Sequence, residues 1–490
     1  MCMPTIRTII LTINVPGLAR LGLWAGLAVL GLNDSAARAQ SIYTPAAAAR
    51  HAQASQDVMD LSRAWRAVLQ YDHTYQAAIS EQAAAQTERA QGRAGLLPQI
   101  QAGYVRSNVS GSASQPNFAG QRVGRELDYK STNGYIQLQQ PLLNYSRYAE
   151  YQRGKARADQ GSAVFDVRRQ ETGIRLATTY FNTLLAYETL ALNRSLGESL
   201  EGQVAGFDAR YQQNEGTRTD AQETRARLAV AKADIIEAED RLVVATRELQ
   251  ALLGSPPKHL AALGSNFPLP PLNPGSLNEW LDRARANNAE IQSARQAVNV
   301  AEAEVDRAAS RYLPTMDLVA TYGKADSENL STLSQRTNTF TIGIQVNIPI
   351  FTGGYNTANV SRTRSDRSRL QYELNAAIER SQAEVTRQYT NVQGGAQRVI
   401  ALEAAVESGQ LSLDSARKGF EVGAWSNLDV LKAQDKLYQA KYELVKARLE
   451  YLLARLQLSA AAGDLHSGPF DEINDLYLGP VIALSRNNNQ

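Results

Sequence analysis

Side chains that commonly perform catalysis or bind metals are few and scattered in this chain. Its only cysteine is Cys2, and its four histidines lie far apart, without the spacing of a metal site, at His51, His73, His259 and His466. No glycine-rich loop ends in Lys followed by Ser or Thr, so the sequence has no motif for binding the phosphates of ATP. We therefore expect no enzyme activity, no cofactor and no metal, which leaves the chemistry of fixed charges.

Charged and turn-forming residues recur at two places with matching spacing. Gly423 can adopt the left-handed conformation that ends a helix, and Ser426 can cap the next helix, with Asp429 in its positive first turn. The same motif occurs 209 residues earlier, where Thr217 and Asp220 occupy the positions of Ser426 and Asp429. A period this long predicts a duplicated half, and each copy of the motif predicts the tip of a helical hairpin.

The helix that follows the second tip carries two stripes with a seven-residue period. In coiled coils, a stripe of large residues packs into a neighbouring helix, and a stripe of small residues lets another backbone approach. The two stripes therefore predict two neighbouring helices, whereas the alternative is an ordinary buried core helix. The large residues are Tyr438, Tyr442, Val445, Leu449, Leu452 and Leu456, and the small ones are Ala433, Ala440, Ala447, Ala454 and Ala461.

The start of the chain has the composition of a secretory signal peptide. Arg7 and Arg20 precede an apolar run over 21–32, and a small-residue cleavage motif predicts removal of residues 1–39. This run is too short to cross a membrane as a helix, and no later segment reaches about 18 consecutive apolar residues. We therefore expect any part of the exported chain that lies inside a membrane to be built of strands.

Four segments alternate between apolar residues and small or polar residues, and each lies next to a proline. They are predicted at about 97–110, 129–142, 313–325 and 338–350. An apolar face opposite a polar face is the pattern of a membrane barrel with a wet interior, but four strands are too few to close one. The chain would have to share a barrel with copies of itself, and a trimer with twelve strands is the simplest solution.

Helices are expected over most of the remaining chain, including single helices over 61–95 and 277–313. The stretch from 143 to about 210 lacks proline, but its glycines predict a break near its middle. We expect an α+β membrane protein with an internal two-fold repeat, in which a long antiparallel α-helical coiled-coil barrel continues into a transmembrane β-barrel shared by the trimer. The expected order is a signal peptide (1–39), an N-terminal segment (40–60), a first repeat (61–254) with its tip at about 211–219, a proline-rich linker (255–276), a second repeat (277–463) with its tip at about 420–428, and a flexible C-terminal tail (464–490).

Both halves resemble the TolC family of outer-membrane channel proteins, the exit ducts of drug efflux pumps and type I secretion systems. The strand motifs that end at Pro141 and Pro349 match the family, and the most specific match is the second tip, with Phe420, Gly423, Ser426, Leu428, Asp429, Val430, Leu431, Leu437, Tyr438, Ala440 and Lys441. The resemblance implies a passive homotrimeric tunnel in the outer-membrane lipid of a Gram-negative bacterium. It also implies a periplasmic adaptor (membrane fusion) protein that opens the tips and links them to an inner-membrane transporter. The tip residues that would meet the adaptor are Tyr211, Asn214, Gly216, Thr217, Phe420, Gly423 and Ser426.

The resemblance further implies a constriction at the tips. Three copies of Asp429 would form an acidic ring that favours cations, and the same carboxylate can also stabilise the start of its helix. The chain has Trp425 where the family has an arginine, and Lys432 where it has a second acidic residue. Neither an arginine latch to Asp220 nor a doubled acidic ring is therefore expected. We expect Trp425 to pack on the neighbouring hairpin and Arg218 to supply a replacement latch.

A periplasmic coiled-coil scaffold, or the adaptor itself, is the alternative to a channel. The symmetric placement of four strands argues against it, and salt would release a scaffold from membranes whereas a barrel requires detergent. Within the channel interpretation, the transporter is either an ABC exporter of polypeptides or a proton-driven drug pump, and the second tip is closer to the secretion branch. The net charge of +2 gives no indication of nucleic-acid binding.

Overall fold

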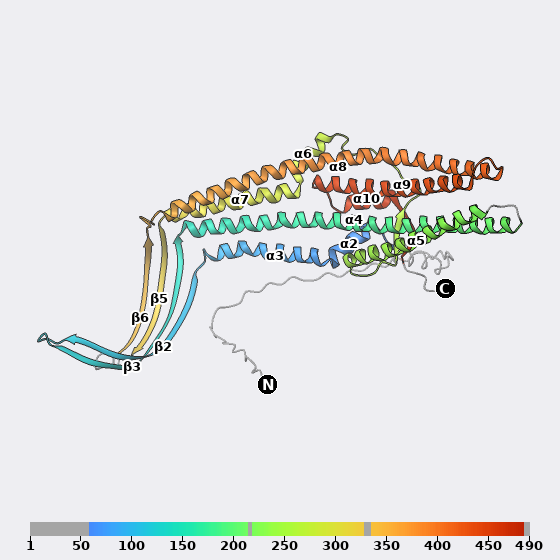
Figure 1. Cartoon of the computed structure of the whole chain (residues 1–490). Coiled ribbons are helices and arrows are strands. Elements are labelled where there is room, and N and C mark those ends of the chain that lie inside the picture. The colour runs from blue at the N-terminus through green and yellow to red at the C-terminus, as the bar shows by residue number, and fades with distance from the viewer. Residues whose placement is uncertain (1–57, 214–217, 328–334, 485–490) are drawn as a thin grey trace, which may run out of the picture. The chain divides into compact units, whose positions relative to one another are not determined.

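Two repeats with the same order of elements make up most of the protein (Figure 1). This computed structural model describes residues 58–213, 218–327 and 335–484, so the predicted signal peptide lies outside the described residues. The first repeat contains α2 (Leu61–Tyr71), α3 (His73–Ala94), β2 (Gln99–Pro116), β3 (Arg122–Leu143), α4 (Tyr145–Gln212) and α5 (Arg218–Leu253). The second contains α6 (Leu277–Asn287), α7 (Ala289–Ala309), the 3-10 turn η1 (Ser310–Tyr312), β5 (Thr315–Ser327), β6 (Gln335–Asn347), α8 (Tyr355–Glu421) and α9 (Asn427–Ala461).

Each repeat begins with two helices rather than the single helix that we expected. The chain turns at Asp72, whose carboxylate accepts a hydrogen bond from the backbone N–H of Tyr75 at 2.9 Å and so caps α3. Asn288 lies 216 residues later and caps α7 in the same way, because its side-chain oxygen accepts from the N–H of Ile291 at 3.0 Å. One short polar side chain in each repeat therefore ends one helix and starts the next.

The long helices α4 and α8 run without interruption over 68 and 67 residues. The break predicted from the glycines of 143–210 is therefore wrong. Two of these glycines are places where α3 comes close to α4: a Cβ at Gly154 would lie 2.4 Å from the backbone oxygen of Glu88, and one at Gly161 would lie 2.2 Å from the Cβ of Ala85. Glycine has an unfavourable helix propensity, but the close packing that it permits offsets this cost.

The long helices lie side by side, in the order α3, α4, α7 and α8 near the strands and α5, α4, α9 and α8 near the tips (Figure 1). The prediction that α9 has two helical neighbours is thus confirmed. Its large residues Leu449, Leu452 and Leu456 are buried in the main core, and so are the alanines of the second stripe, except Ala440, which is half-buried, and Ala433, which lies in a separate core near the tip. Within the described ranges, no helix has an apolar run long enough to cross a membrane.

The four predicted strands form one antiparallel sheet in the order β2-β3-β5-β6. With 18, 22, 13 and 13 residues, they extend beyond the predicted ends at several points. The polar segment between the predicted ends of these two strands, at 111–128, continues the pairing of β2 with β3 as far as a tight turn at Asn117. There the side-chain oxygen of Asn117 accepts from the backbone N–H groups of Ala119 and Gln121. Backbone pairing therefore persists where the alternation of side chains ends.

The register gives the sheet one polar and one apolar face. On the polar face Gln99 lies opposite Gln139, and Thr315 lies opposite Asn347. The other face is apolar and largely exposed in a single chain, with Ile342 61% accessible to solvent. It also contains Ile100, Tyr104, Ile136, Tyr322, Phe340, Ile344 and Val346. Within the described chain, β2 and β6 are the edge strands.

The described part of the C-terminal tail, 464–484, is structured, contrary to our expectation. It forms α10 (Ser467–Tyr477) and β7 (Leu478–Ala483), and Phe470 of α10 stacks on Trp65 of α2 with ring centroids 5.0 Å apart. The proline-rich linker contributes β4 (His259–Leu263), which pairs with both β7 and β1 (Val58–Met59). Three buried residues at helical spacing, Phe470, Ile473 and Tyr477, hold α10 in place, and this short pattern was hidden in a polar, glycine- and proline-rich segment.

Candidate functional site

The second hairpin tip has the capped turn that the sequence predicts. Gly423 has a φ of +74°, and α9 begins directly after Ser426. The hydroxyl oxygen of Ser426 accepts from the N–H of Asp429 at 3.2 Å, and the Asp429 carboxylate accepts from the N–H of Ser426 at 3.1 Å and from its hydroxyl at 2.6 Å. This reciprocal pair is a capping box, so the predicted cap is confirmed.

The capping box also fixes the charge of the tip. The hydrogen bonds from the Ser426 hydroxyl and backbone N–H lower the pKa of the Asp429 carboxyl, and the charge of Lys432 lowers it further. Asp429 is exposed, and it therefore presents a permanent negative charge to solvent at neutral pH.

Trp425 packs on the end of α8 in its own hairpin, and its expected packing on the neighbouring hairpin stays a prediction. Its backbone N–H donates to the carbonyl of Gly419 at 3.2 Å, and a Cβ at Gly419 would lie 3.0 Å from the indole Cγ. Because the chain folds back at Gly423, the indole is placed over the last turn of α8. The side chain is nevertheless 47% exposed, so part of the ring remains available for contact.

Only part of the first tip is described. Tyr211 lies half-exposed near the end of α4, and α5 begins at Arg218 with Asp220 in its first turn. The remaining predicted residues of this tip, Asn214, Gly216 and Thr217, lie outside the described residues.

Asn427, which the sequence did not single out, brings the two tips together. This first residue of α9 is only 2% exposed. Its side-chain N–H groups donate to the hydroxyl of Thr224 at 3.0 Å and, at 3.4 Å, to the backbone oxygen of Asp220, both on α5. The hydroxyl of Thr224 in turn donates to the same backbone oxygen at 2.8 Å. A buried amide therefore links the start of the second return helix to the first turns of α5.

Further contacts continue this link along α9, and we call the whole set the hairpin interface. Leu431 packs with Leu200 and Ala231 in a small apolar cluster. Around that cluster the contacts are polar: Asn427 with Thr224, Gln203 with Gln434 at 2.8 Å, Arg227 with Asp435 at 3.1 Å, and Ser195 with Tyr438 at 3.1 Å. The residues Asn427, Leu431, Gln434 and Tyr438 are four, three and four apart, so the coiled-coil period extends to the tip with polar residues in it.

A groove of about 250 Å³ lies next to the hairpin interface, between α4, α8 and α9. Phe207 and Phe420 form part of its wall, with an edge-to-face contact at 5.7 Å between ring centroids. Arg210, Arg417 and Glu421 add charged groups to the same wall. The groove thus combines aromatic surface with charge at the exposed end of the hairpins.

Comparison with known proteins places this architecture in a family. The model of the outer membrane efflux protein family matches residues 64–255 and 280–464, one match for each repeat. The alkaline protease secretion protein AprF of Pseudomonas aeruginosa is 35% identical over 81% of this chain and 83% of its own length. The proteases secretion protein PrtF of Dickeya chrysanthemi is 32% identical over 84% of this chain and 90% of its own.

Solved structures show the same fold. The CmeC outer membrane channel of Campylobacter jejuni superposes with a TM-score of 0.72 at 16% identity, over 86% of this chain and 90% of that one. CusC superposes with a TM-score of 0.71 at 19% identity, over 83% and 93% of the two chains. Both repeats match the family model, and relatives more than 30% identical cover most of the chain, so this protein belongs to the outer membrane efflux protein family.

Proposed function

We propose that three copies of this chain form a passive duct through the outer membrane, the exit of a tripartite export machine. The observation that carries the proposal is the four-stranded sheet, whose apolar face is exposed and whose two edge strands lie open in a single chain. Three copies would join these edges into twelve strands, with the apolar face toward lipid and the polar face around water. The helices would continue the same wall into the periplasm, and no catalytic step is required.

The cargo that we propose is a polypeptide, moved by an ABC exporter of a type I secretion system. Support comes from AprF and PrtF, both of which are named for the secretion of proteases. Family members in drug or cation efflux are less similar: the cation efflux system protein CusC of Escherichia coli is 25% identical over 59% of this chain. A proton-driven drug pump is therefore the second candidate for the transporter.

We further propose that a periplasmic adaptor opens the duct by docking at the tips. The groove beside Phe207 and Phe420 offers aromatic surface flanked by charges, which suits a helical hairpin of an adaptor. The hairpin interface supports a movable gate, because most of its contacts are single hydrogen bonds or ion pairs that water can replace when α9 moves away from α4 and α5. Arg218 remains a candidate latch at the start of α5.

The acidic constriction is a separate part of the proposal. Asp429 projects from an exposed turn with its charge fixed, so three copies around the axis would favour cations. Asp429→Asn removes the charge and keeps an oxygen that can accept from Ser426, so it should lower cation selectivity in planar bilayers without disturbing the cap. Asp414→Asn on α8 is the matched control. If both variants are as selective as wild type, the ring is not formed by Asp429.

Extraction and mass test the assembly itself. Membranes washed with high salt should retain the protein, detergent should release it, and its mass in detergent should correspond to three chains. Release by salt alone, as a single chain, would favour the scaffold interpretation over the duct.

A further inference from the structure

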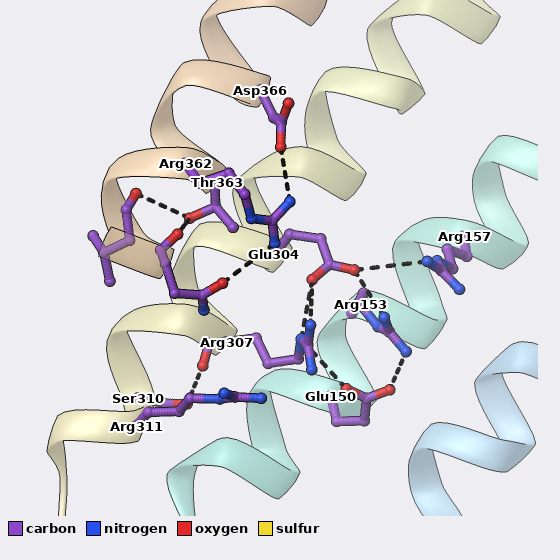
Figure 2. A network of polar contacts seen from close by, with 12 residues as sticks. Glu150, Arg153, Arg157, Glu304, Arg307, Ser310, Arg311, Arg362, Thr363 and Asp366 are labelled. Atoms are coloured by element: carbon purple, nitrogen blue, oxygen red, sulfur yellow. Dashed lines mark hydrogen bonds and ion pairs between the residues drawn. The ribbon is translucent and has the colours of Figure 1, made fainter. Parts of the chain in front are cut away.

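Arginines gather where the long helices meet the strands. Figure 2 shows Arg153 and Arg157 of α4 facing Glu304 and Arg307 of α7, with Glu150 beside them. Glu304 accepts from Arg153 at 2.8 Å, and this contact joins the first repeat to the second. Glu304 also pairs at 3.0 Å with Arg307, which lies one turn further along the same helix. Burial raises the pKa of the Glu304 carboxyl, but the hydrogen bonds and charges of Arg153 and Arg307 outweigh it and hold the pKa below its usual range.

A cavity of about 800 Å³ lies against this network. Its wall includes Gln99, Thr315 and Asn347, which lie on the polar face of the sheet at the strand ends next to the helices. In the trimer proposed above, that face surrounds the water-filled interior. The cavity would therefore open into the duct, at the level where the helical part meets the strands.

The wall of the cavity carries more positive than negative charge. Four arginines and two glutamates line it, so the wall of each cavity has a net charge of +2. Arg153 and Arg307 are paired with glutamates, but no carboxylate of the described residues lies within ion-pair distance of Arg147 or Arg311. Arg311 is held in place by Tyr355, because its guanidinium lies 5.7 Å from the ring centroid and donates to the phenolic oxygen at 3.4 Å. These two guanidinium groups are available to an anion.

Two long helices also begin at this cavity. Asn144 and Ser146 at the start of α4, and Asn356 at the start of α8, are all part of its wall. Gly354, with a φ of +82°, precedes α8 and has no side chain to cap it. The positive ends of both helix dipoles therefore act on the same space as the arginines.

We propose that this cavity binds carboxylates of the exported polypeptide, so that three copies form a ring of basic binding sites inside the duct. The inference rests on the proposed function, because it needs the polar face to surround the channel. Unpaired arginine forks suit carboxylate oxygens, and an open cavity lets an acidic segment enter and leave again. These basic binding sites would attract acidic stretches of an unfolded cargo that has passed the tips.

Side-specific block of single channels tests the proposal. We would add a short polyglutamate peptide to the strand side of wild-type channels in planar bilayers and compare Arg147→Gln/Arg311→Gln with the control Arg241→Gln on α5. The peptide should block wild type and the control equally, and the concentration for half-block should rise about tenfold or more in the double variant. Wild-type conductance steps in all three proteins would show that the duct itself is intact.

Three results would overturn the assignment. Equal block of wild type and the double variant would place the peptide elsewhere, and absence of block in wild type would remove the site. Inorganic phosphate could also block the wild-type channel at the same concentration of negative charge as polyglutamate, and lose this block in the double variant. That result would identify a site for small anions rather than for cargo carboxylates. Absence of conductance steps in wild type would instead count against the duct.

Discussion

If the hairpin interface holds the tips closed, as proposed, Asn427→Ala should open them. Asn427 is buried between the hairpins, and its amide donates to Thr224 at 3.0 Å. Alanine removes this bond and the longer one, at 3.4 Å, to the backbone oxygen of Asp220. The Thr224 hydroxyl still donates to that oxygen at 2.8 Å, so neither partner of Asn427 is left without a hydrogen bond. The substitution therefore weakens the contact between α9 and α5 with little effect on the fold of either helix.

The size of the effect follows from the number of copies. A buried neutral hydrogen bond contributes about 1 kcal/mol net to the state that contains it. If the three tips of a trimer open together, the closed state loses about 3 kcal/mol in total. The ratio of open to closed channels should then rise about 150-fold, provided that the bond is absent in the open state.

Single-channel recording measures this ratio as the fraction of time spent in the high-conductance state. Asn299→Ala on α7 is a suitable control, because among the described residues its side chain bonds only to Gln296 of the same helix. Cells that produce Asn427→Ala should also become sensitive to large antibiotics that an intact outer membrane excludes. An unchanged open fraction in Asn427→Ala would refute the idea that the hairpin interface holds the tips closed.

Three further predictions concern packing and charge. Gly154→Ala should lower the stability of the detergent-solubilised protein by about 1–3 kcal/mol in thermal melts, because its Cβ would meet the backbone of α3. In the control Gly202→Ala the new Cβ has open space around it, so the same melts should show a gain of about 1 kcal/mol. Phe470→Ala should cost about 3–5 kcal/mol, and a melting temperature equal to that of wild type would contradict the account of α10. Ser426→Ala removes the main cause that lowers the pKa of Asp429, so as the pH falls cation selectivity should be lost at a higher pH than in wild type, and identical pH profiles would argue against Asp429 as the selective group.

Local sequence rules predict the structure correctly where turn and cap residues lie next to one another in the chain. Gly423 and the pair Ser426 and Asp429 define the second tip from three residues, because a left-handed glycine and a capping box need no partner elsewhere in the chain. The duplicated motif and the two stripes of α9 likewise predicted the repeat and the two helical neighbours. These features depend on periodicity and on backbone geometry, both of which can be read directly from the sequence.

The features that were missed depend on contacts between distant segments. Gly154 suggested a break because its propensity is unfavourable, but α3 packs against it and the helix continues. The role of Asn427 depends on Thr224, about 200 residues away in the sequence, and a lone Asn after a serine cap gives no indication of that contact. Phe470 is buried because α10 packs into the main core, where Trp65 stacks on it, and the sequence of the tail by itself does not show these contacts.

Single-channel recording of the purified wild-type protein tests the central claim most directly. A trimeric duct with closed, acidic tips should give discrete, uniform conductance steps that are selective for cations and rare at rest. A detergent-extracted trimer that inserts into bilayers and yet gives no such steps would contradict the account, because the polar face of its sheet would then not surround a continuous channel.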